Sequence, residues 1–111
     1  FVYADKDQLI RIFNNLVKNA IQSIPEEREG KIELFLRQKN NYYITEVKDN
    51  GTGISADRSD KIFTPNFTTK STGMGLGLAM VKNIVETYNG TITFETEKDK
   101  GTRFIVTFPK V

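Results

Sequence analysis

The stretch Asp5-Lys-Asp-Gln-Leu-Ile-Arg-Ile-Phe-Asn-Asn-Leu-Val-Lys-Asn-Ala-Ile-Gln-Ser-Ile-Pro25 decides which fold class this chain can adopt. Its apolar residues recur every three or four positions, as they do along the buried face of an amphipathic helix. They are Leu9, Ile10, Phe13, Leu16, Val17, Ala20, Ile21 and Ile24. We therefore predict a helix over residues 6–23, with Asp5 or Asp7 as its N-cap and Pro25 as its stop.

After this helix the apolar spacing changes from helical to alternating. Residues 32–36 and 43–47 alternate apolar with polar side chains on either side of Asn40-Asn41. This pattern predicts a half-buried β-hairpin. Residues 91–97 and 102–108 repeat the pattern around a turn that contains Gly101, and predict a second hairpin.

Between the hairpins, apolar residues at helical spacing from Leu76 to Val85 predict a second helix, with Gly90 at its C′ position. The expected fold class is α+β: a two-layer sandwich with a mixed, mostly antiparallel sheet and helices packed on one face. At 111 residues the chain fits one domain, residues 1–111. Because it begins at Phe1 within an expected strand, we expect it to be a piece of a longer protein.

The composition excludes several classes of function. Basic and acidic residues number 16 and 14, for a net charge of +2, and no Lys/Arg run suggests nucleic-acid binding. The absence of cysteine excludes disulfides and thiolate metal sites. No stretch approaches the roughly 20 apolar residues of a membrane span. Histidine is also absent, which limits the chemistry that this chain can perform alone.

Four segments carry residues suited to chemistry, and the last three fall in or border a long loop over residues 48–77, with a short helix expected near 58–63. They read Asn15-Leu-Val-Lys-Asn-Ala20, Asp49-Asn-Gly-Thr-Gly53, Phe63-Thr-Pro-Asn-Phe-Thr-Thr-Lys70 and Gly73-Met-Gly-Leu-Gly-Leu78.

The first segment places Asn15 and Asn19 one helical turn apart, so their amides project side by side. They can be a solvated polar face, or a pair of amide oxygens that hold Mg²⁺ against nucleotide phosphates. Lys18 beside them supplies positive charge.

The second segment places Asp49 at the end of a strand, ahead of the turn-forming Gly51 and Gly53. Asp-Asn-Gly can be a plain turn. A carboxylate there can instead accept a hydrogen bond from an adenine amino group, whereas guanine would present a carbonyl oxygen, which predicts ATP over GTP.

The last two segments read as a polar lid and a phosphate-binding turn. Phe63 and Phe67 are candidate anchors for residues 68–72, which can close over a nucleotide, or they can be two aromatic residues that tether an inert loop. The backbone of Gly73, Gly75 and Gly77, ahead of the second helix, can bind phosphates or can be a flexible loop. Neither the Walker A pattern nor a dinucleotide fingerprint fits.

In order and spacing, the four segments resemble the N box, first glycine box, F box and second glycine box of the histidine kinase catalytic domain. That family shares the Bergerat fold with DNA gyrase B, Hsp90 and MutL, and the resemblance covers nearly the whole chain. The F box departs from the family pattern at Asn66, and the short lid most resembles the nitrogen-regulation type of sensor kinase.

The resemblance implies ATP and Mg²⁺ as cofactors. It implies metal ligation by Asn19 assisted by Asn15, phosphate contacts from Lys18 and Lys70, and adenine binding by Asp49. The other matched nucleotide-binding positions are Gly51, Gly53, Gly73, Gly75, Leu76, Gly77, Leu78 and Thr102.

Within the superfamily, ATPases and serine kinases usually carry Glu where this chain has Asn15, because water or a hydroxyl needs a general base. An imidazole, with an unperturbed pKa of about 6.5, already has a free lone pair at neutral pH. Asn15 therefore favours a histidine kinase over a gyrase- or Hsp90-like ATPase or an anti-sigma-type serine kinase. A pseudokinase interaction module without nucleotide remains an alternative.

The family implies partners outside these residues. They are a histidine-bearing dimerisation domain of the same protein and a response regulator. The family also implies that the full-length protein is a homodimer, with this domain in the cytoplasm and an anchor in the bacterial inner membrane. No nucleic-acid partner is expected.

Because the chain has no histidine, we predict that it binds Mg·ATP without phosphorylating itself. After incubation with ATP labelled in the γ-phosphate, the denatured chain should retain no label. Label on any other residue would contradict the assignment.

Overall fold

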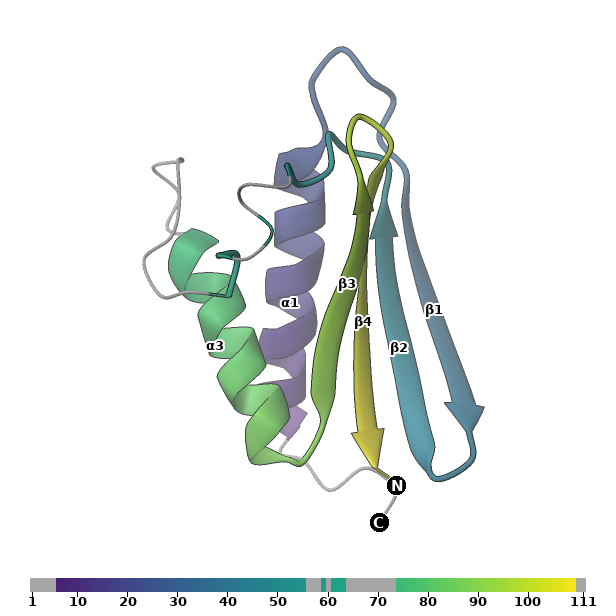
Figure 1. Ribbon diagram of the computed structural model, residues 1–111, viewed down its shortest axis with the longest axis vertical. Helices are drawn as coiled ribbons and strands as arrows, with labels where there is room; N and C mark the ends of the chain where they lie inside the picture. Colours follow the sequence, from purple (N-terminus) through teal and green to yellow (C-terminus); the bar gives the residue numbers. More distant parts are fainter. Residues whose placement is uncertain (1–5, 56–58, 60, 64–73, 110–111) are drawn as a thin grey trace.

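The computed structural model describes residues 6–55, 59, 61–63 and 74–109 (Figure 1). The strand expected at residues 1–3 and the loop at 64–72 lie outside this part. Of the short helix expected at 58–63, residues 58 and 60 also lie outside it, Ser59 is helical and residues 61–63 form a turn. Within the described part, the elements follow the order helix, hairpin, helix, hairpin.

Helix α1 spans Lys6–Ser23, as predicted. Its buried stripe is Ile12, Leu16 and Ala20, spaced four residues apart. Ile10 and Ile21, which share the apolar pattern, are instead largely exposed, because they lie to one side of that stripe.

The sheet has the order β1-β2-β4-β3, and each neighbouring pair is antiparallel (Figure 1). Its strands are β1 (Ile32–Lys39), β2 (Tyr42–Asp49), β3 (Thr91–Glu97) and β4 (Gly101–Pro109). Both predicted hairpins are confirmed. The sheet was expected to be mixed; among the described strands it is wholly antiparallel.

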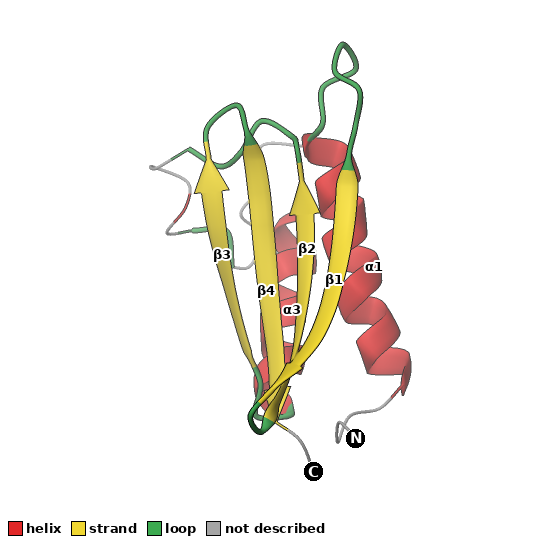
Figure 2. Cartoon of the chain, turned by 90° about the vertical axis from the view of Figure 1, so that its right-hand side faces the viewer, coloured by secondary structure: helices red, strands yellow, loops and turns green. Residues whose placement is uncertain are grey.

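Both helices lie on one face of the sheet, which confirms the two-layer α+β class (Figure 2). Helix α1 packs mainly on β2, and α3 (Met74–Thr87) packs on β3 and beside α1. One cluster of buried side chains fills the interface. It comprises Ile12, Leu16, Ala20, Val47, Ile62, Leu78, Val81, Val85, Phe104, Val106 and Phe108.

The end of α3 differs from the prediction in one respect. Asn89, with φ of 62°, takes the left-handed C′ position that was expected for Gly90. The amides of Asn89 and Gly90 donate to the carbonyls of Glu86 (3.0 Å) and Val85 (2.9 Å), the two bonds of a Schellman motif. Gly90 follows at C″, where a Cβ would collide with the Thr107 carbonyl oxygen. Glycine is therefore needed there for close packing.

Strand β1 also differs, because its alternation does not produce burial. Leu34 and Leu36 are 62% and 78% exposed. Of the three alternating apolar residues, only Ile32 packs against the core. Strand β1 is an edge strand, and α1 contacts β2 far more than β1. The alternating pattern predicted the strand correctly, but it did not predict that no helix buries Leu34 and Leu36.

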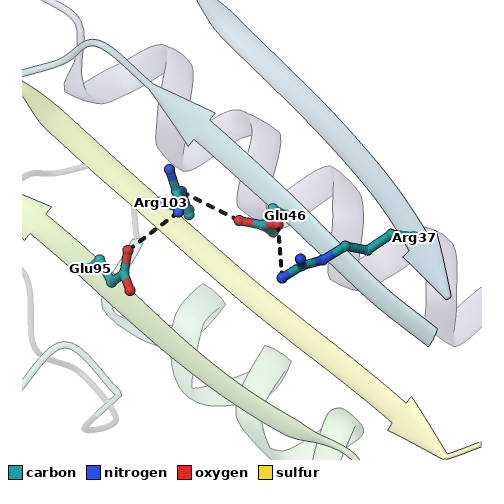
Figure 3. A network of polar contacts seen from close by, with 4 residues as sticks. All are labelled: Arg37, Glu46, Glu95 and Arg103. Atoms are coloured by element: carbon teal, nitrogen blue, oxygen red, sulfur yellow. Dashed lines mark hydrogen bonds and ion pairs between the residues drawn. The ribbon is translucent and has the colours of Figure 1, made fainter. Parts of the chain in front are cut away.

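The face of the sheet without helices carries an ionic network that crosses all four strands (Figure 3). Glu46 on β2 lies between Arg37 (3.5 Å) and Arg103 (3.3 Å), and Arg103 also contacts Glu95 (3.4 Å). The Glu46 side chain is only 12% exposed. A carboxylate so far withdrawn from water depends on its cationic partners.

We predict that Glu46→Gln lowers the free energy of unfolding by about 1 kcal/mol, because two arginines lose a shared and largely buried anion. Chemical denaturation followed by circular dichroism measures it. Glu33→Gln is the matched control, since Glu33 has one 3.9 Å contact with an exposed Lys31. Its effect should stay within about 0.5 kcal/mol. Equal effects of the two substitutions would contradict the prediction.

Candidate functional site

A row of three polar side chains crosses the sheet at the end of its core-facing side. Asp49 pairs with Thr102 across β2 and β4, and Thr102 pairs with Thr96 across β4 and β3. Two residues away on each strand, towards the middle of the sheet, Val47, Phe104 and Phe94 form the equivalent apolar row. Because side chains alternate between faces along a strand, both rows face the helices. The polar row thus closes one end of the core.

The Asp49 carboxylate is 4% exposed and is held through one of its oxygens. Its Oδ1 accepts a hydrogen bond from the Gly51 amide at 2.8 Å and lies 3.2 Å from the Ser23 hydroxyl. That hydroxyl also lies 2.8 Å from the Ala20 carbonyl oxygen, so its single proton is shared. With Oδ1 engaged by these donors, Oδ2 is the oxygen left to accept from a ligand.

Glycines allow backbone segments to approach the Asp49 carboxylate closely. A Cβ on Gly51 would lie 2.6 Å from the Ser23 carbonyl oxygen, and one on Gly101 would collide with the Asp49 carbonyl oxygen. Gly53 has φ of 75°, and its Cβ would lie 2.5 Å from the Glu97 carbonyl oxygen. Side chains at these positions are excluded by backbone atoms that cannot rotate away.

Further hydrogen bonds clamp residues 49–54 from both sides. The Thr52 amide donates to the Ser23 carbonyl (3.0 Å), and the Asp99 amide donates to the Thr52 carbonyl (2.7 Å). Arg28 donates to the carbonyls of Asn50 (2.6 Å) and Gly51 (2.8 Å). The segment is therefore a rigid bridge between the end of α1 and the β3–β4 turn.

Sequence reasoning missed Ser23, Arg28 and Thr96. Ser23 lies two turns after Asn15 on α1, a spacing that could have indicated a shared side of the helix. Thr96 belongs to an alternating strand, where a polar residue at a core-facing position was a usable signal. Arg28 carries no local signal, because only the tertiary structure brings it to Asn50.

Asn15, Lys18 and Asn19 lie on α1, as expected. The Asn15 amide nitrogen donates to the Arg11 carbonyl at 2.8 Å, which turns its Oδ1 away from the helix backbone. Asn15 and Asn19 are half-buried and Lys18 is exposed. Because Asn19 is one turn before Ser23, the amides and the Asp49 contact share one side of α1.

The second glycine segment departs from the prediction. Gly75 and Gly77 lie within the first turn of α3 rather than ahead of it, and Leu76 lies in that turn, within the helix as predicted. Leu78 is buried and belongs to the hydrophobic core. Gly73 and Lys70 lie outside the described residues. The amide groups of this first turn have no helical partners and form the positive end of the helix dipole.

Phe63 packs against the core, whereas Phe67 and the lid that both residues were expected to anchor lie outside the described residues. The Phe63 ring meets those of Phe94 and Phe104 edge-on, with centroids 6.0 and 6.4 Å apart. Lys82 Nζ lies 5.6 Å from the Phe63 ring centroid. The loop that leads to the predicted lid is therefore tied to the core next to the polar row.

Two general features of the described residues bear on the class of site. No three His, Cys, Asp or Glu side chains there gather closely enough to hold a metal ion, so a metal would need amide or ligand oxygens. No helix among them has the length and apolarity to cross a membrane.

Comparisons with known proteins identify the family. The family model described as histidine kinase-, DNA gyrase B-, and HSP90-like ATPase matches residues 4–111. The sensor histidine kinase ZraS of Escherichia coli K12 is 44% identical over 97% of this chain and 23% of its own length. For sporulation kinase A of Bacillus subtilis the identity is 36%, over 99% and 18%. The chain thus spans about a fifth of these relatives.

A solved structure gives the same result. The catalytic domain of the histidine kinase ThkA superposes with a TM-score of 0.85 at 35% identity, over 98% of this chain and 70% of that one. The chain belongs to the family of histidine kinase-, DNA gyrase B- and HSP90-like ATPases, and within it to the ATP-binding catalytic domains of sensor histidine kinases.

Proposed function

We propose that residues 1–111 form one domain that binds Mg·ATP and donates the γ-phosphoryl group to a histidine on a separate domain of the same protein. The observation that carries this proposal is the Asp49 carboxylate, 4% exposed and held through Oδ1 by the Gly51 amide. A buried, preorganised acceptor of this kind selects a ligand that can donate to it.

Base recognition follows from the polar row. Asp49 Oδ2 accepts a hydrogen bond from the adenine amino group, and Gly51 and Gly53 let the backbone beside the base pack closely against Ser23 and Glu97. Thr102, 5% exposed and paired with Asp49 across the strands, completes the pocket. Guanine would place a carbonyl oxygen against the carboxylate, and two acceptors facing each other repel.

The side of α1 that carries Asn15 and Asn19 suits a hard cation. Amide oxygens are ligands that Mg²⁺ accepts, and the Asn15 oxygen is turned outward by the bond to Arg11. When bound there, Mg²⁺ would neutralise negative charge on the phosphates. Lys18 and Lys70 would add positive charge. The first turn of α3, with Gly75, Leu76 and Gly77 and preceded by Gly73, would direct backbone amides at the phosphates, and Leu78 would hold that turn on the core.

The nucleophile must come from elsewhere, since this chain has no histidine. Phosphoryl transfer requires in-line positioning and charge neutralisation more than covalent chemistry from the protein. Asn15 fits this requirement, because a neutral imidazole needs no carboxylate to remove its proton before attack. The acceptor imidazole would lie on a dimerisation domain of the same protein, in a homodimer that then phosphorylates a response regulator.

The location of the domain is part of the same proposal. ATP is available in the cytoplasm, so the domain would work there. An anchor in the bacterial inner membrane would belong to the remainder of the protein.

Asp49→Asn should weaken ATP binding about tenfold or more, because one charge-assisted hydrogen bond to the base is lost. Isothermal titration with Mg·ATP and Mg·GTP measures it, and the unaltered chain should prefer ATP. Asp99→Asn, the same chemical change in an exposed turn, is the control. Equal ATP affinity for Asp49→Asn would refute the base assignment. Absence of ATP binding by the unaltered chain would favour a pseudokinase module.

Asn19→Ala should remove most of the gain in ATP affinity that Mg²⁺ provides, while binding in EDTA stays unchanged. Titrations with and without Mg²⁺ give this difference directly. Asn14→Ala is the matched control, since Asn14 is exposed on the same helix. If Asn19→Ala weakens binding equally in both conditions, Asn19 does not act through the metal.

A further inference from the structure

The Thr96 hydroxyl joins three segments that meet behind the Asp49 carboxylate. Its Oγ1 accepts a hydrogen bond from the Ile54 amide at 2.8 Å. The same oxygen lies 2.9 Å from Thr102 Oγ1 and 3.3 Å from the Gly101 carbonyl oxygen. Residues 42 positions apart in the sequence are thus joined through one side chain.

Counting protons gives this arrangement a direction. Thr96 has a single hydroxyl proton, and one of its lone pairs is occupied by the Ile54 amide. Thr96 donates that proton to the Gly101 carbonyl oxygen, so its second lone pair accepts from the Thr102 hydroxyl at 2.9 Å. The Thr102 proton is thus directed at Thr96, and the Thr102 lone pairs are left to accept from a ligand. Without Thr96, the Thr102 hydroxyl could turn either way.

A hydroxyl that accepts suits the ligand edge proposed for Asp49. The adenine amino group carries two protons and only donates. A carboxylate acceptor beside a hydroxyl acceptor, directly or through a water molecule, matches those two protons. Hypoxanthine presents a carbonyl oxygen in place of the amino group and is mismatched with both acceptors.

We propose that Thr96 is a positioning residue for base selection: it sets the direction of the Thr102 hydrogen bond and holds the backbone after Gly53 in place. The inference rests on the proposed function, in which Asp49 receives adenine. Thr96 does not contact the base. It orients the hydroxyl of Thr102 and holds the backbone amide of Ile54.

The test compares dissociation constants for ATP and for ITP, which carries hypoxanthine, measured by titration with Mg²⁺. The unaltered chain should bind ITP about tenfold or more weakly than ATP. Thr96→Val keeps the side-chain shape and removes the hydroxyl. It should reduce this ratio about threefold or more, mainly by weakening ATP. Thr96→Ser, which keeps the hydroxyl, should restore the ratio.

Thr93→Val is the control, because Thr93 is exposed on the same strand. This substitution should leave the ratio of the ITP and ATP dissociation constants unchanged. If Thr96→Val weakens ATP and ITP equally, Thr96 is only structural and the inference is overturned. If Thr96→Val does not fold, Thr96→Ala takes its place in the same comparison.

A failure of the proposed function gives a different result. In that case the unaltered chain binds no ATP, or it prefers ATP no more than ITP and Asp49→Asn changes nothing. A Thr102→Val background provides a second check. If Thr96 acts through Thr102, Thr96→Val should change the ratio little when Thr102 is already altered.

Discussion

The contact between α1 and the sheet buries Ile12, Leu16 and Ala20 in one cluster with Val47 and Phe104, and the positions of the α1 site residues relative to Asp49 depend on it. Full burial of one large aliphatic side chain contributes about 1.5–3 kcal/mol, whereas an exposed ion pair contributes about 1 kcal/mol or less. Apolar packing therefore sets where α1 lies. Once it is set, Ser23 at the end of the helix reaches Asp49, and the asparagine side of α1 faces the same region.

The site is an extension of the core rather than a separate structure. Val47, Phe104 and Phe94 form one row across the sheet, and Asp49, Thr102 and Thr96 form the next. A buried polar group must find hydrogen-bond partners, and these three largely find them in one another and in the adjacent backbone. The same contacts that remove the cost of burial also hold the groups still, which is what selective recognition of a base requires.

Missing side chains matter as much as those present. Gly51, Gly53 and Gly101 let the end of α1 and the β3–β4 turn close on residues 49–54 to within backbone contact distance. On the opposite face, Arg103, the residue after Thr102, is held by Glu46 and Glu95. The strand that carries Thr102 is therefore fixed from both faces, by the hydroxyl row on one and by the ionic network on the other.

Local pattern was enough to predict the helices, both hairpins and the two-layer class, because periodicity and turn residues act over a few positions. Motif order was also enough to predict the family and the place of Asp49 at a strand end. Pattern alone predicted burial for Leu34 and Leu36, which are exposed, because an alternating strand carries no information about which element packs on its apolar face. It also placed Gly90 where Asn89 lies, and Gly75 ahead of a helix that contains it. Ser23, Arg28 and Thr96 acquire their roles only through contacts between segments distant in the chain, and such contacts are decided by how the layers pack.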